Sequence, residues 1–578
     1  MAQIDNPFYY RDNFEFVLNW VGQRYADVLN GDEHGFIQQY RGLPPASRAL
    51  LVRMVMRRGV LFRHSRLRYP EIGCVASAVT PLVQAGWVTE NPQLNLQQLF
   101  GLFTKTEILR AFADQGLSPT LSKSALYTQL AAASAPPEAH EQTTCSCTNG
   151  KHAFGLAQAG FPANSTQTFF SSSWWEQASD AVCELLIMPL CERFRLMFFG
   201  NLRQDWSEFV LSDLGLLRYE KVGFTASCRA LGHRQDVDDY LHLHACTGRL
   251  LEGESPRAIM ACVPTQAYAN GWIERRRSKL LFRIGQACER DKDWEGALQA
   301  YKVSSHSESR LRQVRVLERD LRYGQALQSA EAVLGEPVSD AEAQQLARIY
   351  PRLRRKLGLP VQIQAQPRPP ESLTIHARPD DTATSVEEVA RRHVHRDDAP
   401  AHYTENALIN ALFGLLCWDA LFAPLAGAFF HPFQRGPADL REPDFVRRRQ
   451  RHFESCLALL DSNRYQHVIW ANFKAKAGLQ CAFVHWPALS PELLQQALQC
   501  IPPDHLKKWF RRLLDDIPGN RSGFPDLIQF WPLERRYRML EVKGPGDRLQ
   551  DNQKRWMAFF SRHDMPVAVC FVRWMKSP

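Results

Sequence analysis

The chain has 578 residues, of which 45% are hydrophobic, and a net charge of +9 from 70 basic and 61 acidic side chains. This length accommodates several domains with sizeable cores, and the composition excludes wholesale disorder. Because the positive excess is modest, where it is placed matters more than its sum. The fourteen cysteines stand mostly alone in apolar runs, which is typical of reduced thiols and excludes a disulfide scaffold.

Residues 1–85 are predicted to form a helix-rich, winged-helix-like DNA-binding region. The first thirty residues contain Asp5, Arg11 and Glu15 and lack an apolar core, so no secretory signal is expected. Residues 47–57 have an amphipathic pattern that predicts a helix.

Residues 59–69 mix apolar and basic side chains, a pattern that suits a β-wing. Arg66 and Arg68 are predicted on one strand face, and Arg63 near the turn. All three are candidate contacts to DNA phosphates. An ordinary charged sheet face explains the same pattern equally well.

Residues 86–140 contain a predicted helix–loop–helix. Thr104 and Ser122 are suited to cap its two helices, and residues 116–119 (Gly-Leu-Ser-Pro) separate them. The segment resembles a SAP-type DNA-binding module. Lys123, at the start of the second helix, is therefore a further candidate DNA contact.

Residues 141–370 are predicted to form a helical repeat domain. The segment 294–301 recurs loosely at 323–330, with an aromatic residue followed by small residues, as in tetratricopeptide-like (TPR-like) repeats. Such solenoids hold peptides or act as scaffolds, so protein partners are expected there. Arg310 and Arg312 lie in an arginine-rich stretch that suits either a DNA cradle or a solvated helix face.

Two shorter segments flank or interrupt these modules. Cys145 and Cys147 with His152 are the nearest approach to a metal cluster, but a second pair at zinc spacing is missing, so no zinc site is expected. Residues 361–370 are rich in proline and glutamine and read as a connector.

Residues 371–578 are predicted to form an α/β domain. Ser385 followed by Glu388 predicts a capped first helix. Residues 407–430 approach the length of a membrane span, but Asn410, Asp419 and Pro424 interrupt the apolar run. A buried helix that ends near Pro424 is therefore expected, with no membrane association.

The strongest chemical signal is Pro525-Asp526 followed fifteen positions later by Glu541-Val542-Lys543. Residues 526–530 and 539–543 read as neighbouring antiparallel strands. Since side chains two apart share a strand face, Glu541 and Lys543 point the same way. Two carboxylates with the Val542 carbonyl suit a hard cation such as Mg²⁺ or Mn²⁺. A solvated strand face is the alternative.

The segment after this strand supports the catalytic interpretation. Residues 544–546 (Gly-Pro-Gly) end the strand, and residues 547–560 are predicted to form a helix with Gln553 on or near its polar side. Residues 523–526, 541–549, Gln553 and Trp556 together resemble the VRR-NUC type of PD-(D/E)xK nuclease. More closely, they resemble the Fanconi anaemia-associated nuclease family.

This resemblance implies a multidomain, mainly α protein with a C-terminal α/β nuclease domain. Residues 403–419 match the family's helix that carries a further acidic metal ligand, here Glu405. Lys543 takes the position of the catalytic lysine, and Gln553 supports the site. The implied ligands of Mg²⁺ or Mn²⁺ are Glu405, Asp526, Glu541 and the Val542 backbone carbonyl.

The resemblance further implies a structure-specific endonuclease that cuts 5′ flaps, has 5′-to-3′ exonuclease activity and acts in interstrand crosslink repair. Branched or flapped DNA is the expected partner, and no small-molecule cofactor is expected. No Cys/His set with ubiquitin-binding zinc-finger spacing precedes residue 70, which indicates a bacterial-type member. Its expected location is the cytoplasm, associated with the nucleoid, or the nucleus in a eukaryote.

The residues alone predict only a metal-dependent phosphodiesterase. One alternative is a non-catalytic scaffold that binds DNA and proteins. Another is a nuclease that acts on RNA or four-way junctions, because the active-site chemistry does not depend on the architecture of the substrate.

Overall fold

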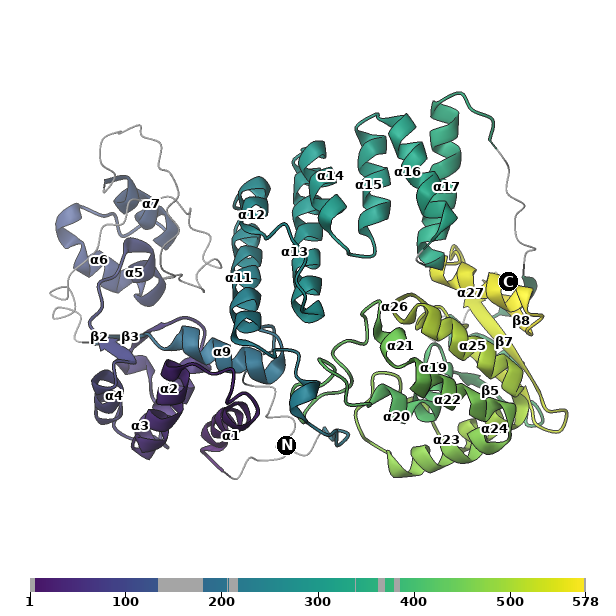
Figure 1. Cartoon of the computed structure of the whole chain (residues 1–578), viewed down its shortest axis with the longest axis horizontal. Coiled ribbons are helices and arrows are strands. Elements are labelled where there is room, and N and C mark those ends of the chain that lie inside the picture. Colours follow the sequence, from purple (N-terminus) through teal and green to yellow (C-terminus); the bar gives the residue numbers. More distant parts are fainter. Residues whose placement is uncertain are drawn as a thin grey trace. The chain divides into compact units, whose positions relative to one another are not determined.

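The computed structural model describes residues 6–133, 180–204, 206, 217–337, 339–361, 370–378 and 385–575 (Figure 1). The chain divides into two compact units: Met1–Leu216 with Gly232–Val237, and Leu217–Leu231 with Asp238–Pro578. The predicted Cys145, Cys147 and His152 group lies outside the described residues, as does most of the predicted connector 361–370.

The first unit begins with helices around a small antiparallel sheet. Asn30 opens the second helix through a capping box with Glu33, which satisfies two backbone N–H groups of the first turn. The sheet has the strand order β1-β3-β2. The elements are α1 (Tyr9–Arg24), α2 (Gly31–Gly42), α3 (Pro45–Val55), β1 (Leu61–Arg63), the 3₁₀ helix η1 (His64–Arg66), α4 (Val75–Gln84), β2 (Val88–Glu90), β3 (Val182–Leu185) and α9 (Met188–Phe199).

The predicted wing differs from the structure in one respect. Strand β1 ends at Arg63, and the chain turns at once into the 3₁₀ helix His64–Arg66. The prediction that Arg66 and Arg68 share a strand face is therefore wrong, although both side chains are exposed. The sheet is completed by β3, whose Val182 pairs with Arg63 across more than a hundred residues of sequence.

The predicted helical hairpin is confirmed, with both caps. The Thr104 side chain forms a capping box with Glu107, and Ser122 Oγ accepts a hydrogen bond from the Ala125 N–H at 3.1 Å. Ile108 and Leu126 meet in a small separate core. The elements are α5 (Leu96–Leu102), α6 (Lys105–Ala111), the 3₁₀ helix η2 (Ala113–Gln115) and α7 (Lys123–Ala133).

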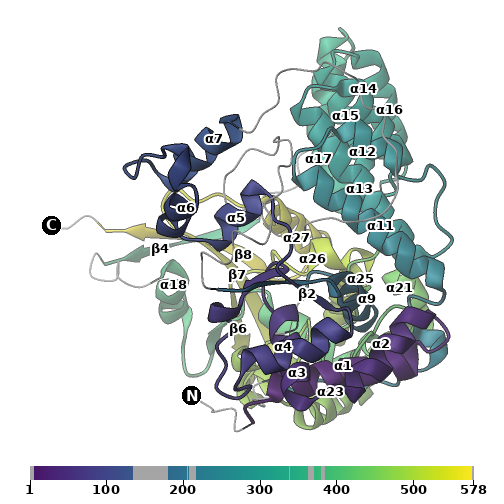
Figure 2. The ribbon, with the colours of Figure 1, turned by 90° about the vertical axis from the view of Figure 1, so that its left-hand side faces the viewer.

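The second unit contains a stack of helices whose neighbours pack side by side (Figure 2). Helices α14 and α16 begin at Trp294 and Tyr323, where the sequence repeat predicts them. A Cβ atom on Gly285 would lie 2.6 Å from the Tyr301 ring, so this glycine allows α13 and α14 to approach closely. The helices are α11 (Arg234–Leu251), α12 (Pro256–Cys262), α13 (Gly271–Arg290), α14 (Trp294–Val303), α15 (Ser309–Arg319), α16 (Tyr323–Gly335) and α17 (Asp340–Lys356).

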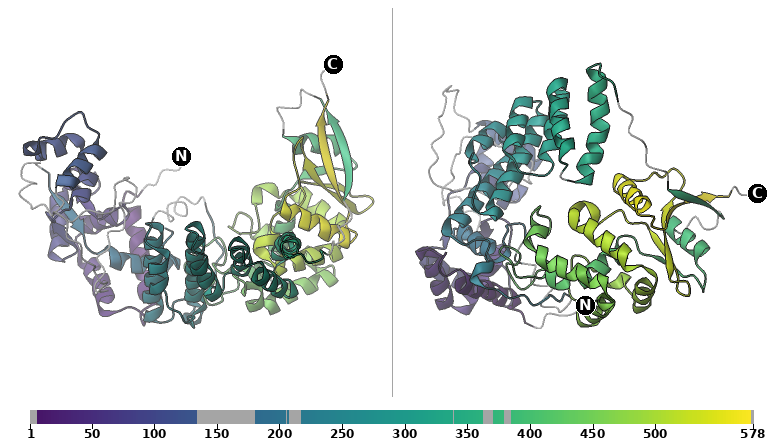
Figure 3. Two further views of the ribbon diagram at one scale, coloured as in Figure 1. Left: turned by 90° about the horizontal axis from the view of Figure 1, so that it is seen from above. Right: turned by 45° about the vertical axis from the view of Figure 1, so that its right-hand side comes forward.

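The C-terminal part of this unit contains a β-sheet flanked by helices (Figure 3). The sheet is mixed and five-stranded, with the order β4-β8-β7-β6-β5. Strand β6 is antiparallel to both β5 and β7, whereas β8 is parallel to both β7 and β4. The strands are β4 (Glu371–Ala377), β5 (Ala401–Tyr403), β6 (Leu527–Trp531), β7 (Arg536–Lys543) and β8 (Val567–Trp574).

Helices cover both faces of this sheet. Leu540 and Val542 of β7 pack with Val389 of α18, whereas Met539 shares a larger core with Trp509 of α25 and Trp556 of α27. The helices are α18 (Val386–Val394), α19 (Ala407–Leu416), α20 (Trp418–Leu421), α21 (Phe445–Arg448), α22 (Gln450–Ala458), α23 (Arg464–Ala475), α24 (Pro491–Cys500), α25 (Pro503–Asp515), α26 (Ile517–Asn520) and α27 (Asp551–Arg562).

Three predictions about this domain can be compared directly with the structure. Ser385 caps α18 by accepting the Glu388 N–H, as predicted. The apolar run forms the buried helix α19 and the short α20, which ends at Leu421; among the described residues no helix is long and apolar enough to cross a membrane. The last helix begins at Asp551, so the predicted start at Asp547 is wrong.

Candidate active site

The register of β6 against β7 brings Asp526 and Glu541 together. Leu527 pairs with Leu540 in this antiparallel ladder, so Asp526, one residue before β6, stands across from Glu541. Directly opposed residues in such a ladder present their side chains to the same face. The Val542 N–H fixes the Asp526 carboxylate by donating to its Oδ2 at 2.8 Å.

Glu405 is brought to Asp526 by the neighbouring strand pair. Tyr403 of β5 pairs with Leu527 of β6. The backbone N–H groups of Thr404 and Glu405 then donate to the Asp526 carbonyl at 2.9 and 3.2 Å. Glu405 therefore lies in the turn before α19, and the prediction that it lies on a helix is wrong. Asn406 adopts a φ of 53° there.

Lys543 lies beside Glu541, as the strand alternation predicts. Its Nζ is 2.7 Å from Glu541 Oε1, and the Glu541 side chain is fully buried. Apart from this ion pair, neither Glu541 oxygen receives a hydrogen bond from the described residues. The N–H and C=O of one strand residue point to the same side, so the Val542 carbonyl faces Asp526 together with its N–H.

The two buried acids have strongly shifted proton affinities. Burial raises the pKa of Glu541 to about 7, and the neighbouring Asp526 adds to this effect while Lys543 opposes it. Burial likewise raises the pKa of Asp526 to about 6, against the hydrogen bond from Val542. The negative charge of Glu405 raises the pKa of both. A hard cation with oxygen ligands would relieve this excess of buried negative charge.

The side chain of Glu405 points elsewhere in this structure. It accepts hydrogen bonds from the Tyr403 hydroxyl at 2.5 Å and from Asn406 Nδ2 at 3.1 Å. Within the described ranges, no three acidic, histidine or cysteine side chains are already arranged to hold an ion. Because Glu405 is exposed, its carboxylate can rotate toward Asp526 without repacking the core.

A fourth acid near the site is Glu387, which the sequence did not predict there. Its charge raises the pKa of both Asp526 and Tyr403. Its helix starts beside the end of β7, since a Cβ atom on Gly544 would lie 3.3 Å from Val386 Cγ1. No spacing signal in the sequence connects Glu387 with Asp526 or Glu541. The neighbouring Glu388 instead pairs with Arg391 and Arg392 of its own helix.

Helix α27 positions the loop that leads to Asp526. The Phe524 and Trp556 rings are 4.1 Å apart, and a Cβ atom on Gly523 (φ 95°) would lie 2.9 Å from the backbone of Asn552. Only glycine allows this close approach. Gln553 helps to cap the start of the same helix, because its side-chain oxygen accepts the Gln550 N–H at 2.8 Å. Its expected support of the acids remains a prediction.

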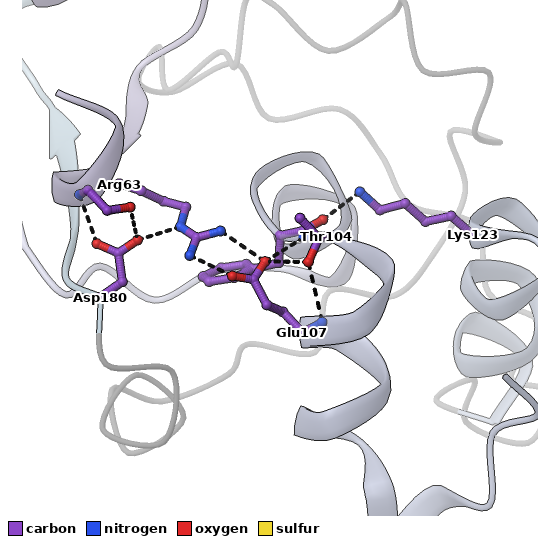
Figure 4. A network of polar contacts seen from close by, with 7 residues as sticks. Arg63, Thr104, Glu107, Lys123 and Asp180 are labelled. Atoms are coloured by element: carbon purple, nitrogen blue, oxygen red, sulfur yellow. Dashed lines mark hydrogen bonds and ion pairs between the residues drawn. The ribbon is translucent and has the colours of Figure 1, made fainter. Parts of the chain in front are cut away.

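The predicted DNA-contact residues differ in how far they are already engaged (Figure 4). Arg63 is buried and donates to Asp180 at 2.7 Å and to both Glu107 oxygens at 2.9 and 2.7 Å. These hydrogen bonds engage the Arg63 guanidinium inside the fold, and its contact with DNA phosphates remains a prediction. Lys123 Nζ donates to the Phe103 carbonyl at 2.6 Å.

Two arginines of the repeats are also partly engaged. Arg310 donates to the Glu336 carbonyl at 3.0 Å, and Arg312 lies 3.5 Å from Glu289. Arg66 and Arg68 are exposed. DNA contact by Lys123 and by these four arginines remains a prediction.

Three family models match the chain. They are described as "FAN1, HTH domain" (residues 8–89), "Fanconi anemia-associated nuclease SAP domain" (residues 93–142) and "VRR-NUC domain" (residues 460–574). A "Fanconi-associated nuclease 1 homolog" of Pseudomonas aeruginosa is 49% identical over 571 residues, which is 99% of this chain and 97% of that protein. The chain belongs to the Fanconi-associated nuclease family. The predicted family, the mainly helical fold with its C-terminal α/β domain and the nuclease activity are thereby confirmed.

Further similarities extend along the whole length of this family member. A homolog of Oryza sativa subsp. japonica is 24% identical over 97% of this chain and 62% of that protein. Among solved structures, "Crystal structure of paFAN1 bound to 2nt 5'flap DNA with gap" matches with a TM-score of 0.86, 48% identity and full coverage of both chains. Nucleases with the VRR-NUC domain depend on divalent metals, which agrees with the oxygen ligands described above.

Proposed function

We propose that this family member is a structure-specific DNA endonuclease that cuts 5′ flaps, has 5′-to-3′ exonuclease activity and acts in interstrand crosslink repair. The observation that carries the proposal is the convergence of Asp526, Glu541 and Lys543, with Glu405 held against the Asp526 backbone. The flap preference is supported by paFAN1, whose structures are described as bound to 5′ flap DNA.

The proposed ligands of the divalent ion, Mg²⁺ or Mn²⁺, are Asp526, Glu541, the Val542 carbonyl and Glu405 after its side chain rotates. The buried oxygens of Glu541, whose one described partner is the Lys543 ammonium, fit such an ion. When bound, the ion supplies Lewis-acid stabilisation of charge on the phosphate.

The remaining chemistry belongs to the protein's own side chains. Lys543 carries three N–H donors beside Glu541, where it orients the attacking water or neutralises charge that develops on the phosphate oxygens. The Val542 N–H keeps the Asp526 carboxylate oriented throughout. Burial of both acids strengthens these interactions because water is excluded around them.

The other modules are proposed to position the DNA. Their proposed boundaries are 1–85, 86–140 and 141–370, with the nuclease domain at 371–578. Arg66 and Arg68 are exposed and suited to phosphates, and the repeats are suited to protein partners. The proposed location is the bacterial cytoplasm, associated with the nucleoid.

Asp526→Asn tests the proposed site. Cleavage of a gapped 5′ flap should fall by at least about 10³-fold because the variant loses a carboxylate that stabilises the ion. DNA binding, measured by fluorescence anisotropy, should stay nearly unchanged. Glu534→Gln, an exposed acid in the β6–β7 turn, is the matched control. Normal cleavage by Asp526→Asn would refute the assignment.

The substrate is tested with the unmodified protein and a panel of 5′ flaps, 3′ flaps, four-way junctions, single strands and RNA, each with Mg²⁺ or Mn²⁺. Flaps with a 5′ single strand should be cut fastest, and EDTA should stop all cleavage. Faster cleavage of junctions or RNA would contradict the flap assignment and leave the active-site assignment intact.

A further inference from the structure

A charged cavity of the nuclease domain reaches one of the candidate metal-binding acids, Glu405. It has a volume of about 660 Å³, and Glu405 and Asn406 lie in its wall. Three arginines, Arg435, Arg441 and Arg521, line the same cavity. The cavity therefore has an acid of the candidate metal site in its wall, together with three guanidinium groups.

None of these three arginines has a carboxylate partner among the described residues. The acids that stand close to Arg441 in the sequence are engaged with other arginines. Asp439 pairs with Arg448 and Arg449 at 2.6 and 2.8 Å. Glu442 and Asp444 both pair with Arg275, at 3.0 and 3.9 Å. The cavity is thus lined by three guanidinium groups, none of which forms an ion pair with a described carboxylate, and by the single acid Glu405.

Arg521 shows how the cavity holds an uncompensated charge. Its guanidinium stacks 4.5 Å from the centre of the Phe483 ring and donates to the Ala482 carbonyl. Its Nε is buried and donates to no acceptor in the described chain. Arg435 is anchored similarly, because its Nε donates to the Cys481 carbonyl at 3.3 Å.

The electrostatics of Arg521 agree with this geometry. Burial lowers the pKa of Arg521, and the charges of Arg441 and Arg435 lower it further. Such crowding is unfavourable in the free protein and becomes favourable once an anion enters. Planar guanidinium groups match the geometry of phosphate oxygens, to which they donate in pairs.

We propose that Arg435, Arg441 and Arg521 bind a DNA phosphate group next to the phosphodiester that is cleaved at Asp526 and Glu541. The pocket holds the strand on one side of Glu405 while the acids act on the other. This inference rests on the proposed nuclease function and adds to it a positioning site within the nuclease domain. The phosphate belongs either to an internal linkage or to a strand terminus.

The test uses the full-length protein, Mn²⁺ and a gapped 5′ flap DNA under single-turnover conditions. Arg435→Ala and Arg441→Ala remove exposed side chains, so folding should be retained and can be checked by thermal unfolding. Each should lower the single-turnover cleavage rate at subsaturating protein about tenfold, since a charge-assisted hydrogen bond to phosphate is lost. Arg451→Ala, an exposed arginine outside this cavity and without a described ion pair, should cleave normally.

The phosphate itself is located with modified DNA. Neutral methylphosphonate linkages are introduced one at a time around the cut, and 5′-phosphorylated and 5′-hydroxyl ends are compared. One modification should slow the unmodified protein about tenfold and have no further effect on Arg441→Ala. A methylphosphonate effect supports an internal phosphate, and an effect of the 5′ end supports a terminal one.

Two results would overturn the inference. In the first, both arginine variants cleave as fast as Arg451→Ala. In the second, the two variants are slower than the unmodified protein by the same factor on every modified substrate, which would mean that no phosphate contact is involved. Neither result affects the nuclease assignment, because that depends on the separate test of Asp526→Asn.

Discussion

The Arg63 network of the first unit and the Glu541 group of the second use charge in opposite ways. Arg63 is surrounded by Glu107 and Asp180, and its hydrogen bonds to Glu107 lower the pKa of that acid to about 2 (Figure 4). Glu541 stands beside another acid in a buried position, which raises its pKa to about 7. Balanced charges of this kind hold a fold together, whereas unbalanced ones indicate a missing ligand.

The same contrast applies to arginines. The guanidinium of Arg63 forms ion pairs inside the protein, whereas Arg435 and Arg441 line a cavity and have no described carboxylate partner. The number of arginines in a segment therefore says little about DNA contact. An arginine is available to contact DNA when no neighbouring acid already pairs with it.

Glu541→Gln should have the largest effect, because it should lower cleavage and raise the stability of the fold at the same time. Cleavage should fall by at least about 10³-fold because a ligand carboxylate is lost. Thermal stability in EDTA at pH 8 should nevertheless rise. The pKa of Glu541 is raised from 4.5 to about 7, so its ionisation costs stability as the pH rises through 7. Glutamine removes this cost.

The measurement is thermal unfolding of both proteins between pH 5 and pH 8, with EDTA or with Mn²⁺. Mn²⁺ should raise the Tm of the unmodified protein and leave that of Glu541→Gln nearly unchanged. A lower Tm of Glu541→Gln in EDTA at pH 8 would mean that Glu541 stabilises the fold, and the contrast with Arg63 would disappear.

Arg63→Ala should lower the stability of the fold, which is the opposite of the effect expected for Glu541→Gln in EDTA. The variant leaves Glu107 and Asp180 without their cation, and the first unit should lose about 2–3 kcal/mol of unfolding free energy. Urea denaturation followed by circular dichroism measures this loss. Arg66→Ala, an exposed neighbour, should change stability by less than about 0.5 kcal/mol. Equal effects of the two substitutions would show that the network contributes little.

Glu107→Gln should have the smallest effect, and that effect should depend on pH. The pKa of Glu107 is lowered from 4.5 to about 2, so its contribution is present above pH 4.5 and is lost as the pH falls through 2. At pH 7 the variant should be less stable by about 1 kcal/mol. The difference between the two proteins should shrink between pH 5 and pH 2 in urea titrations. A constant difference would assign the effect to packing.

Local features of the sequence predicted much of this structure. The alternation of Glu541, Val542 and Lys543 placed two side chains on one strand face, and the capping roles of Thr104 and Ser385 were correct. These features depend on neighbours within a few residues, which is the range over which backbone periodicity and capping chemistry operate.

Features that depend on distant pairing were not predicted from the sequence. The partners of Arg63 inside the fold were not foreseen, because Asp180 follows 117 residues later, beyond the reach of any local pattern. Glu405 was expected on a helix, whereas its position comes from the pairing of β5 with β6. Glu387 was missed because its charge acts through space on Asp526.

The dependence of the site on strand register has a consequence for the safety of the cell. A shift of β7 by one residue against β6 would turn Glu541 and Lys543 to the opposite face. A newly made or misfolded copy therefore has no assembled cutting centre, even though every required side chain is present. Cleavage by incompletely folded copies is therefore limited by the pairing of β6 with β7 itself.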